Sequence, residues 1–242
     1  MINGGDSGIG RAAAIAFARE GADVAIAYLP EEEADAREVI QLFKAEGRIA
    51  VALPGDITHE AWCHDLVEQA VSALRGLDIL VINAGRRKYH ETIEALSTAD
   101  FDRTMKTNLY ALHRIARAAV PHLPSGSSVI TTASIQAYQP SPFLLDYSST
   151  EAGIVAYTKA LAKQLIERGI RANVVAPGPV WTVLQPSGGQ SNDKVENFGK
   201  DSDFGRAGQP VELAPVFVLL ASPDASFING EVYGVTVGKG VA

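Results

Sequence analysis

Three polar side chains in the middle of the chain could act together on one carbonyl group. Ser134 follows a run of β-branched residues, and Tyr147 opens a helix-forming segment shortly after it. A phenol can donate a proton to a carbonyl oxygen, and a neighbouring hydroxyl can stabilise the negative charge that develops there. Asn108 is the third candidate. Taken singly, the three residues have ordinary structural interpretations as a polar cap, a half-buried aromatic residue and a side chain inside a helix.

A glycine-rich segment lies near the N-terminus. It reads Asn3-Gly4-Gly5-Asp6-Ser7-Gly8-Ile9-Gly10 and directly precedes an alanine-rich segment that is typical of a helix. Glycine lets the backbone turn sharply and approach a ligand, and a helix N-terminus offers N–H groups and a partial positive charge. The segment therefore indicates a phosphate-binding loop. The alternative is a tight strand-to-helix turn that uses glycine for steric reasons alone.

Two further segments favour the binding of a dinucleotide. Asp56 follows one strand candidate, where its carboxylate could accept a hydrogen bond from an adenine amino group. Asn83-Ala84-Gly85 follows the next, where small residues leave room for a ribose. Because ligands of open α/β sheets bind at the carboxyl ends of the strands, these segments and the glycine loop should meet at one edge.

The elements that must position these residues alternate along the chain. Short apolar runs, expected to be strands, cover residues 23–29, 48–53, 77–83, 128–133, 170–176 and 231–237, after a truncated first strand before the glycine loop. Segments expected to be helices cover residues 9–20, 32–46, 60–74, 98–122, 147–168 and 211–221. This alternation predicts a single-domain α/β fold over residues 1–242, a Rossmann-type doubly wound parallel sheet with helices on both faces. Residues 177–210 form a long irregular stretch that is expected to be a substrate lid.

Taken together and in order, these motifs resemble the short-chain dehydrogenase/reductase family over essentially the whole chain. The matching pieces are the glycine loop, residues 82–85, Asn108, Ser134, Tyr147-Ser148-Ser149-Thr150 and Pro177-Gly178. Residues 134–142 and 176–182 look more narrowly like bacterial NAD(P)-dependent aldehyde reductases and general-stress oxidoreductases.

The resemblance implies an enzyme that reduces a small aldehyde or ketone with NADP or NAD. Tyr147 would donate the proton, Ser134 would hydrogen-bond the same oxygen, and Asn108 would hold a water molecule in a proton relay. Thr182 matches the residue that bonds the nicotinamide carboxamide. The full set expected to bind the cofactor is Gly4, Asp6, Ser7, Gly8, Ile9, Gly10, Arg11, Tyr28, Asp56, Ile57, Asn83, Ala84, Gly85, Pro177, Gly178 and Thr182. The family also implies a homotetramer that pairs through the segments 98–122, 147–168 and 231–237.

The chain departs from the family pattern at position 151, where Glu151 occupies the place of the usual lysine. Residues i and i+4 are neighbours on a helix, so position 151 faces Tyr147. A negative charge there would raise the pKa of the phenol, in place of the positive charge that would lower it. We expect aldehyde reduction to survive weakly and alcohol oxidation to be nearly lost. The alternative function is a dinucleotide-binding protein without useful turnover, acting as a sensor or an oligomeric partner.

The choice between the two cofactors depends on the end of the second strand. An acidic residue there would favour NAD, whereas an arginine nearby accommodates the 2′-phosphate of NADP. This strand ends at Tyr28 and Leu29 with no acid, and Arg11 could reach a phosphate, so the sequence favours NADP and leaves use of both cofactors open.

Composition excludes several classes of function. With 21 Lys and Arg against 28 Asp and Glu, the net charge of −7 disfavours nucleic-acid binding. A single cysteine, Cys63, excludes an internal disulfide and a zinc cluster built on cysteines, and the histidines show no metal-ligand spacing. No secretion signal or membrane span is evident, so a cytoplasmic protein is expected. The basic run Arg86-Arg87-Lys88 is interpreted as a solvated loop, with a position at the mouth of the active site as the alternative, and nothing in the sequence identifies the substrate.

Overall fold

Seven short apolar segments pair side by side in the computed structural model, which describes residues 1–240. All pairs are parallel, and the order across the sheet is β3-β2-β1-β4-β5-β6-β7. The strands are β1 (Ile2–Asn3), β2 (Val24–Tyr28), β3 (Ala50–Pro54), β4 (Ile79–Ile82), β5 (Ser128–Thr132), β6 (Arg171–Pro177) and β7 (Val232–Val235). This confirms the predicted doubly wound sheet.

The first strand is as short as the sequence predicts, although it lies at the centre of the sheet. Ile2 pairs with Ile26 of β2 on one side and with Val81 of β4 on the other. Ile2, Ile26 and Val81 are fully buried, as parallel strands covered on both faces must be. The direction of the chain reverses across the sheet at this strand, and ligands of such sheets bind where that reversal occurs.

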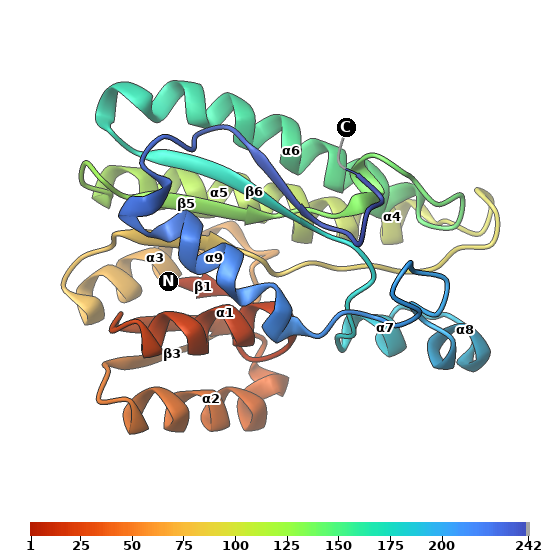
Figure 1. Cartoon of the computed structure of the whole chain (residues 1–242), viewed down its shortest axis with the longest axis horizontal. Coiled ribbons are helices and arrows are strands. Elements are labelled where there is room, and N and C mark those ends of the chain that lie inside the picture. The colour runs from red at the N-terminus through yellow and green to blue at the C-terminus, as the bar shows by residue number, and fades with distance from the viewer. Residues whose placement is uncertain (241–242) are drawn as a thin grey trace.

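Helices cover both faces of the sheet, as Figure 1 shows. The helices are α1 (Gly8–Arg19), α2 (Glu33–Ala45), α3 (Glu60–Leu74), α4 (Thr98–Met105), α5 (Ala111–Ala119), α6 (Leu145–Leu165), α7 (Leu184–Ser187), α8 (Asn192–Glu196) and α9 (Ala214–Ala221). One apolar core lies under α1, α2 and α9 and contains Phe43 and Phe217. The other lies under α3, α5 and α6 and contains Leu66 and Leu112.

The segment expected as one helix over residues 98–122 is interrupted in the structure. A π-helical turn, Lys106–Tyr110, separates α4 from α5, and a 3-10 turn, Val120–His122, follows α5. The π turn contains Asn108, whose side chain bonds the backbone of Arg86 in the loop after β4. Isolated π turns inside α-helices are often found at functional sites. The helix expected over residues 60–74 is observed with the same bounds, as α3, and the other expected helices differ from the observed ones at their ends.

The carboxyl ends of the strands meet at one edge of the sheet, where the long segment 177–210 crosses. This segment contains the short helices α7 and α8, which lie together at one end of the molecule in Figure 1. Within residues 1–240, no helix is both long enough and apolar enough to span a lipid bilayer.

Candidate active site

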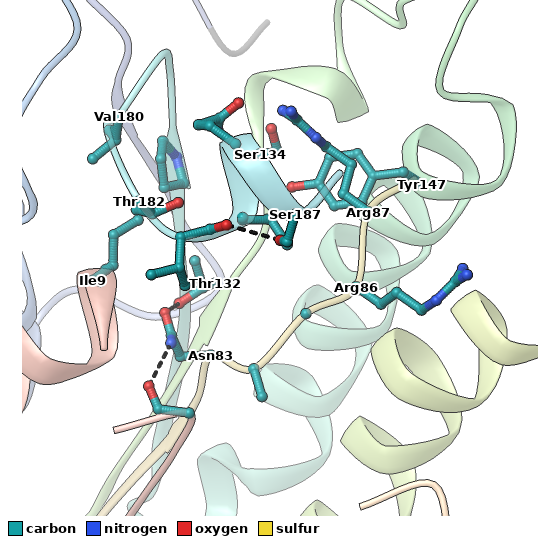
Figure 2. A pocket seen from close by; sticks show the side chains of 18 of the residues that line it. Ile9, Asn83, Arg86, Arg87, Thr132, Ser134, Tyr147, Val180, Thr182 and Ser187 are labelled. Carbon is teal, nitrogen blue, oxygen red and sulfur yellow. Dashed lines mark hydrogen bonds between the residues drawn. The ribbon is translucent and has the colours of Figure 1, made fainter. Parts of the chain in front are cut away.

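A single large cavity of about 970 Å³ opens along the carboxyl edge of the sheet. It extends from the glycine loop and the ends of β2 and β3, past the loop after β4, to Ser134, Tyr147 and the segment 177–210 (Figure 2). The four residues predicted to be catalytic all line it. So do the residues predicted to bind a cofactor, with the exception of Gly10 and Arg11.

The glycine loop has the backbone shape that an anion site needs. Gly4 and Gly8 have φ values of +66° and +52°, a conformation that side chains with a Cβ rarely adopt. A Cβ on Gly8 would lie 3.3 Å from the Thr182 side chain, across the cavity opening. Helix α1 begins at Gly8, and in the described structure Ser7 makes no side-chain cap and the first turn has no acidic residue. The first N–H groups of this helix therefore face the cavity and suit a phosphate.

Two residues of the predicted set have other roles. A Cβ on Gly10 would lie 1.9 Å from the carbonyl oxygen of Gly4, so Gly10 is required for close packing inside the loop. The Arg11 guanidinium pairs instead with Glu38 of α2, with 3.2 Å between Nη1 and Oε2, and lies outside the lining of the cavity. The prediction that Arg11 reaches a cofactor phosphate has no support from this position.

Asn3 ties the short first strand to the loop after β4. Its Oδ1 accepts hydrogen bonds from the backbone N–H groups of Asn83, at 2.5 Å, and Ala84, at 3.0 Å. Asn83 in turn donates from Nδ2 to the Gly4 carbonyl and accepts from the Thr132 hydroxyl. Through this network Asn3 holds the glycine loop and the predicted ribose site in one fixed arrangement.

Acidic and aromatic side chains surround the end of β2. The Tyr28 hydroxyl donates a 2.5 Å hydrogen bond to Glu33, and burial together with this carboxylate raises the pKa of Tyr28 to about 12. Asp6 is buried at the same end of the cavity, and its burial raises the pKa of its carboxyl. Asp56 accepts a hydrogen bond from the Thr58 backbone N–H at 2.8 Å, which fixes its carboxylate beside the cavity.

Ser134 and Tyr147 meet as the sequence predicts. Ser134 follows β5, and Tyr147 lies in the first turn of α6, where its side chain is buried against the cavity (Figure 2). Both side chains line the same cavity. Burial raises the pKa of the Tyr147 phenol above its usual value of 10, with a smaller contribution from Glu151 that the Ser134 hydrogen bond opposes. The phenol is therefore fully protonated near neutral pH.

Glu151 lies on the same face of α6 as Tyr147 and lines the cavity, but its charge differs from the expectation. Its side chain is only 3% exposed, and burial raises the pKa of its carboxyl from 4.5 to about 8. Near neutral pH most molecules therefore carry a neutral carboxylic acid at this position. Glu151 raises the pKa of the Tyr147 phenol as expected, but burial keeps the Glu151 carboxyl largely protonated near neutral pH, because burying a lone carboxylate costs more than protonating it.

Asn108 is held by protein groups on both sides of its amide. Its Oδ1 accepts a hydrogen bond from the Arg86 backbone N–H at 2.7 Å, and its Nδ2 donates to the Arg86 carbonyl and to the Thr150 hydroxyl. The Thr150 hydroxyl also donates to the Tyr147 carbonyl. Asn108 therefore couples the loop after β4 to the helix that carries Tyr147.

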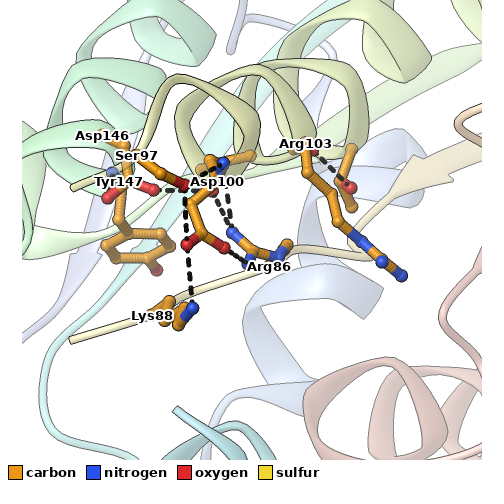
Figure 3. Close-up of polar contacts among 9 residues, drawn as sticks. Arg86, Lys88, Ser97, Asp100, Arg103, Asp146 and Tyr147 are labelled. Carbon is orange, nitrogen blue, oxygen red and sulfur yellow. Dashed lines mark hydrogen bonds and ion pairs between the residues drawn. The ribbon is translucent and has the colours of Figure 1, made fainter. Parts of the chain in front are cut away.

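The basic run after β4 borders the cavity, which is the alternative that the sequence left open, and is not a solvated loop. Asp100 of α4 binds both Arg86 and Lys88, at 2.7 and 2.8 Å, as Figure 3 shows. Arg86 also donates to the Thr104 hydroxyl, which donates to the buried Asp146 at 2.6 Å. The residue between the two ion pairs, Arg87, turns into the cavity. No periodicity or motif distinguishes Arg87 from its neighbours, so the sequence did not single it out within the run.

Across residues 1–240, no group of three His, Cys, Asp or Glu side chains is placed to hold a metal ion. The cavity therefore offers an anion site at one end and a Ser–Tyr hydroxyl pair at the other. That combination suits acid catalysis on a substrate next to a phosphate-bearing cofactor.

Comparison with known proteins supports this arrangement. The family model described as enoyl-(acyl carrier protein) reductase matches residues 4–239. The chain is 54% identical to the uncharacterized oxidoreductase YghA of Escherichia coli K12 over 239 residues, which cover 99% of this chain and 81% of that protein. It is 41% identical to NADPH-dependent aldehyde reductase 1, chloroplastic, of Arabidopsis thaliana, over 96% of this chain and 82% of the relative.

A solved structure shares the fold almost throughout. The short chain dehydrogenase from Burkholderia cenocepacia J2315, crystallised in complex with NADP, superposes with a TM-score of 0.91. The two chains are 29% identical, and the match covers 98% of this chain and 96% of the other.

Proposed function

The chain belongs to the short-chain dehydrogenase/reductase family of oxidoreductases, and from this premise we propose that it reduces a small aldehyde or ketone with NADPH, and less readily with NADH. One observation carries the proposal. Ser134 and Tyr147 line the same cavity as the glycine loop and the open N-terminus of α1. This arrangement supports a proton donor within reach of a cofactor whose phosphates would bind at that helix.

The residues along the cavity fit a nicotinamide dinucleotide in sequence. The backbone from Gly4 to Ile9 would hold the diphosphate, Asp56 and Ile57 the adenine, and residues 83–85 the ribose next to it. Pro177, Gly178 and Thr182 would hold the nicotinamide. When bound, the cofactor supplies the hydride.

The protein residues supply the proton and hold the carbonyl oxygen. Tyr147 donates its phenolic proton to the oxygen as negative charge develops there, and the Ser134 hydroxyl donates a hydrogen bond to the same atom. Because burial raises the pKa of Tyr147, the acid is available at every physiological pH. Asn108 fixes the start of the proton path by holding Thr150 and the backbone of Arg86. The reverse reaction needs a tyrosinate, which this environment disfavours.

Support for NADPH as the preferred reductant comes from proteins similar to this chain. The Arabidopsis relative is named for its dependence on NADPH, and the Burkholderia structure contains NADP. The end of β2 does not add to this support, because Arg11 is paired with Glu38 and Glu32 lines the cavity there. Separate dissociation constants for NADPH and NADH, measured by fluorescence titration, test the preference.

A second candidate function is cofactor binding without useful turnover, and Glu151 is the observation that favours it. The family lysine would place a positive charge beside Tyr147, whereas Glu151 is a neutral acid that ionises above pH 8. An assay of aldehyde-dependent NADPH consumption separates the two functions. Tight NADPH binding without consumption would favour the second.

Assembly and lid are part of the same proposal. We expect a homotetramer, for which exposed apolar side chains on the predicted pairing helices give support, among them Phe101 of α4 and Leu145 of α6. Residues 177–210, with α7 and α8, would close over the substrate, because Val183, Gln185 and Ser187 line the cavity.

A substitution in the glycine loop tests the cofactor site. We expect Gly8→Ala to weaken NADPH binding about tenfold or more, since the new Cβ would occupy the cavity side of the loop near Thr182 at a strained φ of +52°. Gly21→Ala is the matched control, because Gly21 has a φ of +93° with nothing near its Cβ position at the other end of α1. Fluorescence titration of both variants measures the effect. Equal affinities in the two variants would contradict this site.

A further inference from the structure

Among the residues that the structure describes, Arg87 forms no ion pair, although the basic residues on either side of it do. Its Nε and Nη2 atoms are buried and make no hydrogen bond within the part of the chain that the structure describes. On either side of it, Arg86 and Lys88 both bind Asp100. These ion pairs fix the backbone before and after Arg87, so its side chain is directed inward by a rigid loop.

The guanidinium faces the catalytic half of the cavity. Arg87 lines the cavity together with Tyr147, and in Figure 2 both lie on the side of the pocket away from Ile9 of the glycine loop. Gly188, in the lid segment, lies against the Nε and Nη2 edge of the Arg87 guanidinium. A Cβ at Gly188 would lie 3.3 Å from Nε and 3.4 Å from Nη2. The remaining nitrogen, Nη1, is neither buried nor bonded among residues 1–240, so it is the one that meets the cavity.

In the part of the chain that the structure describes, Arg87 forms no ion pair with any of the six acidic residues that line the cavity, Asp6, Glu32, Asp56, Glu151, Asp193 and Asp201. Asp56 and Glu32 accept backbone N–H groups near the other end, and Glu151 is a neutral acid near neutral pH. Burial lowers the pKa of Arg87, and Tyr147, the group among the described residues that opposes this effect, is uncharged near neutral pH. Because native proteins rarely leave a buried charge unpaired, the missing partner is expected from outside the chain.

We propose that Arg87 binds an anionic group of the substrate, a carboxylate or a phosphate, and thereby selects aldehydes or ketones that carry such a group. The inference rests on the proposed reductase function, whose substrate class it specifies. A guanidinium presents parallel N–H donors that match two oxygens of a carboxylate or phosphate. With the carbonyl oxygen at Tyr147 and Ser134, the anion would lie under the lid at Gly188, and its binding would bring the lid and the loop after β4 together.

The phosphates of the cofactor are a different anion and have a different site. The open N-terminus of α1 and the glycine loop lie on the opposite side of the pocket from Arg87 in Figure 2. A variant of Arg87 should therefore leave cofactor affinity unchanged. This separates loss of substrate binding from loss of cofactor binding.

The test compares paired substrates in the full-length chain. Succinate semialdehyde and butanal differ only in carrying a carboxylate or a methyl group at the end of the same chain. Glycolaldehyde phosphate and glycolaldehyde form the corresponding pair for a phosphate. For Arg87→Met we expect kcat/KM to fall by about 10- to 100-fold with one of the anionic substrates and by less than about twofold with the neutral ones. Arg87→Lys should retain part of the selectivity. Arg19→Gln removes the same charge from an exposed position on α1 and should leave kcat/KM unchanged for both the anionic and the neutral substrates.

A binding measurement keeps the test independent of turnover. Titration of the NADP-loaded protein with succinate should show binding that Arg87→Met abolishes, and succinamide should not bind in either case. Because Arg87→Met removes buried donors without a partner, its thermal midpoint should equal or exceed that of the unchanged protein. Equal losses with anionic and neutral substrates would overturn the proposal and indicate an effect on Tyr147 itself. Failure of the unchanged protein to reduce any aldehyde, with succinate still binding through Arg87, would overturn the reductase function alone.

Discussion

Tyr147→Phe should lower the rate of NADPH-dependent aldehyde reduction by about 10²- to 10⁴-fold, the range typical for loss of a general acid. The substitution removes only the phenolic hydroxyl, and the ring still fills its buried site. NADPH binding should therefore change by less than about twofold. Steady-state reduction of the best aldehyde and fluorescence titration of the cofactor measure the two quantities.

Tyr157→Phe is the matched control for this prediction. Tyr157 lies on the same helix, three turns further along, and its hydroxyl contacts His113 and not the cavity. Its loss should leave the rate unchanged. If Tyr147→Phe retained most of the activity, the proton would have to come from another group, and the assignment of Tyr147 would be wrong.

The second large effect is expected at position 151. Glu151→Lys should raise the rate of alcohol oxidation at pH 8 by at least about tenfold, because a cation one helical turn from Tyr147 lowers the pKa of the phenol and makes tyrosinate accessible. Reduction should gain less, since the neutral phenol is already abundant. Glu151→Gln separates shape from charge. It should match the unchanged protein near pH 6, where Glu151 is protonated, and exceed it in oxidation at pH 9. Equal oxidation rates for all three proteins would contradict this account.

The same carboxyl makes stability depend on pH in a defined direction. The pKa of Glu151 rises from 4.5 to about 8 on folding, so above pH 4.5 the native protein holds a proton that the unfolded chain releases. The free energy of unfolding therefore falls as the pH rises from 4.5 towards 8. The fall should be roughly 3 to 6 kcal/mol, and urea unfolding at pH 5 and pH 8 measures it. Glu151→Gln should lose most of this dependence, whereas an unchanged dependence would assign it to other groups.

The fold could be predicted from the alternation of apolar strands and amphipathic helices, because a buried parallel sheet leaves that pattern in the sequence. Even β1, with two residues, was predicted from its place before the glycine loop. The π turn around Asn108 could not be predicted. One extra residue in a helical turn leaves no hydrophobic signature, and the bonds to Arg86 and Thr150 that accompany it join segments far apart in the sequence.

The candidate site was predicted as far as it depends on residue type and order. Ser134, Tyr147 and the glycine loop line one cavity because strands β1 and β5 end at the same edge of the sheet. Side-chain state was not predictable. The neutral carboxyl of Glu151 depends on how completely α6 is buried, and Arg11 is drawn away by Glu38, which α2 brings beside it.

The inward orientation of Arg87 was equally hidden in the sequence. This orientation depends on Asp100 of α4, which binds Arg86 and Lys88, the residues on either side of Arg87. Burial and ion pairing of this kind arise only once the helices are packed. The motifs of the sequence therefore predict the cofactor site and the hydroxyl groups, but not the residue that we propose to select the substrate.

A crystal structure of the protein soaked with NADPH is the most direct test of the central claim. The account predicts electron density for the diphosphate at the N-terminus of α1 and for the nicotinamide between Thr182 and Tyr147, with its reactive carbon facing the phenol. A crevice closed by the segment 177–210, or a nicotinamide bound away from Tyr147, would contradict the account.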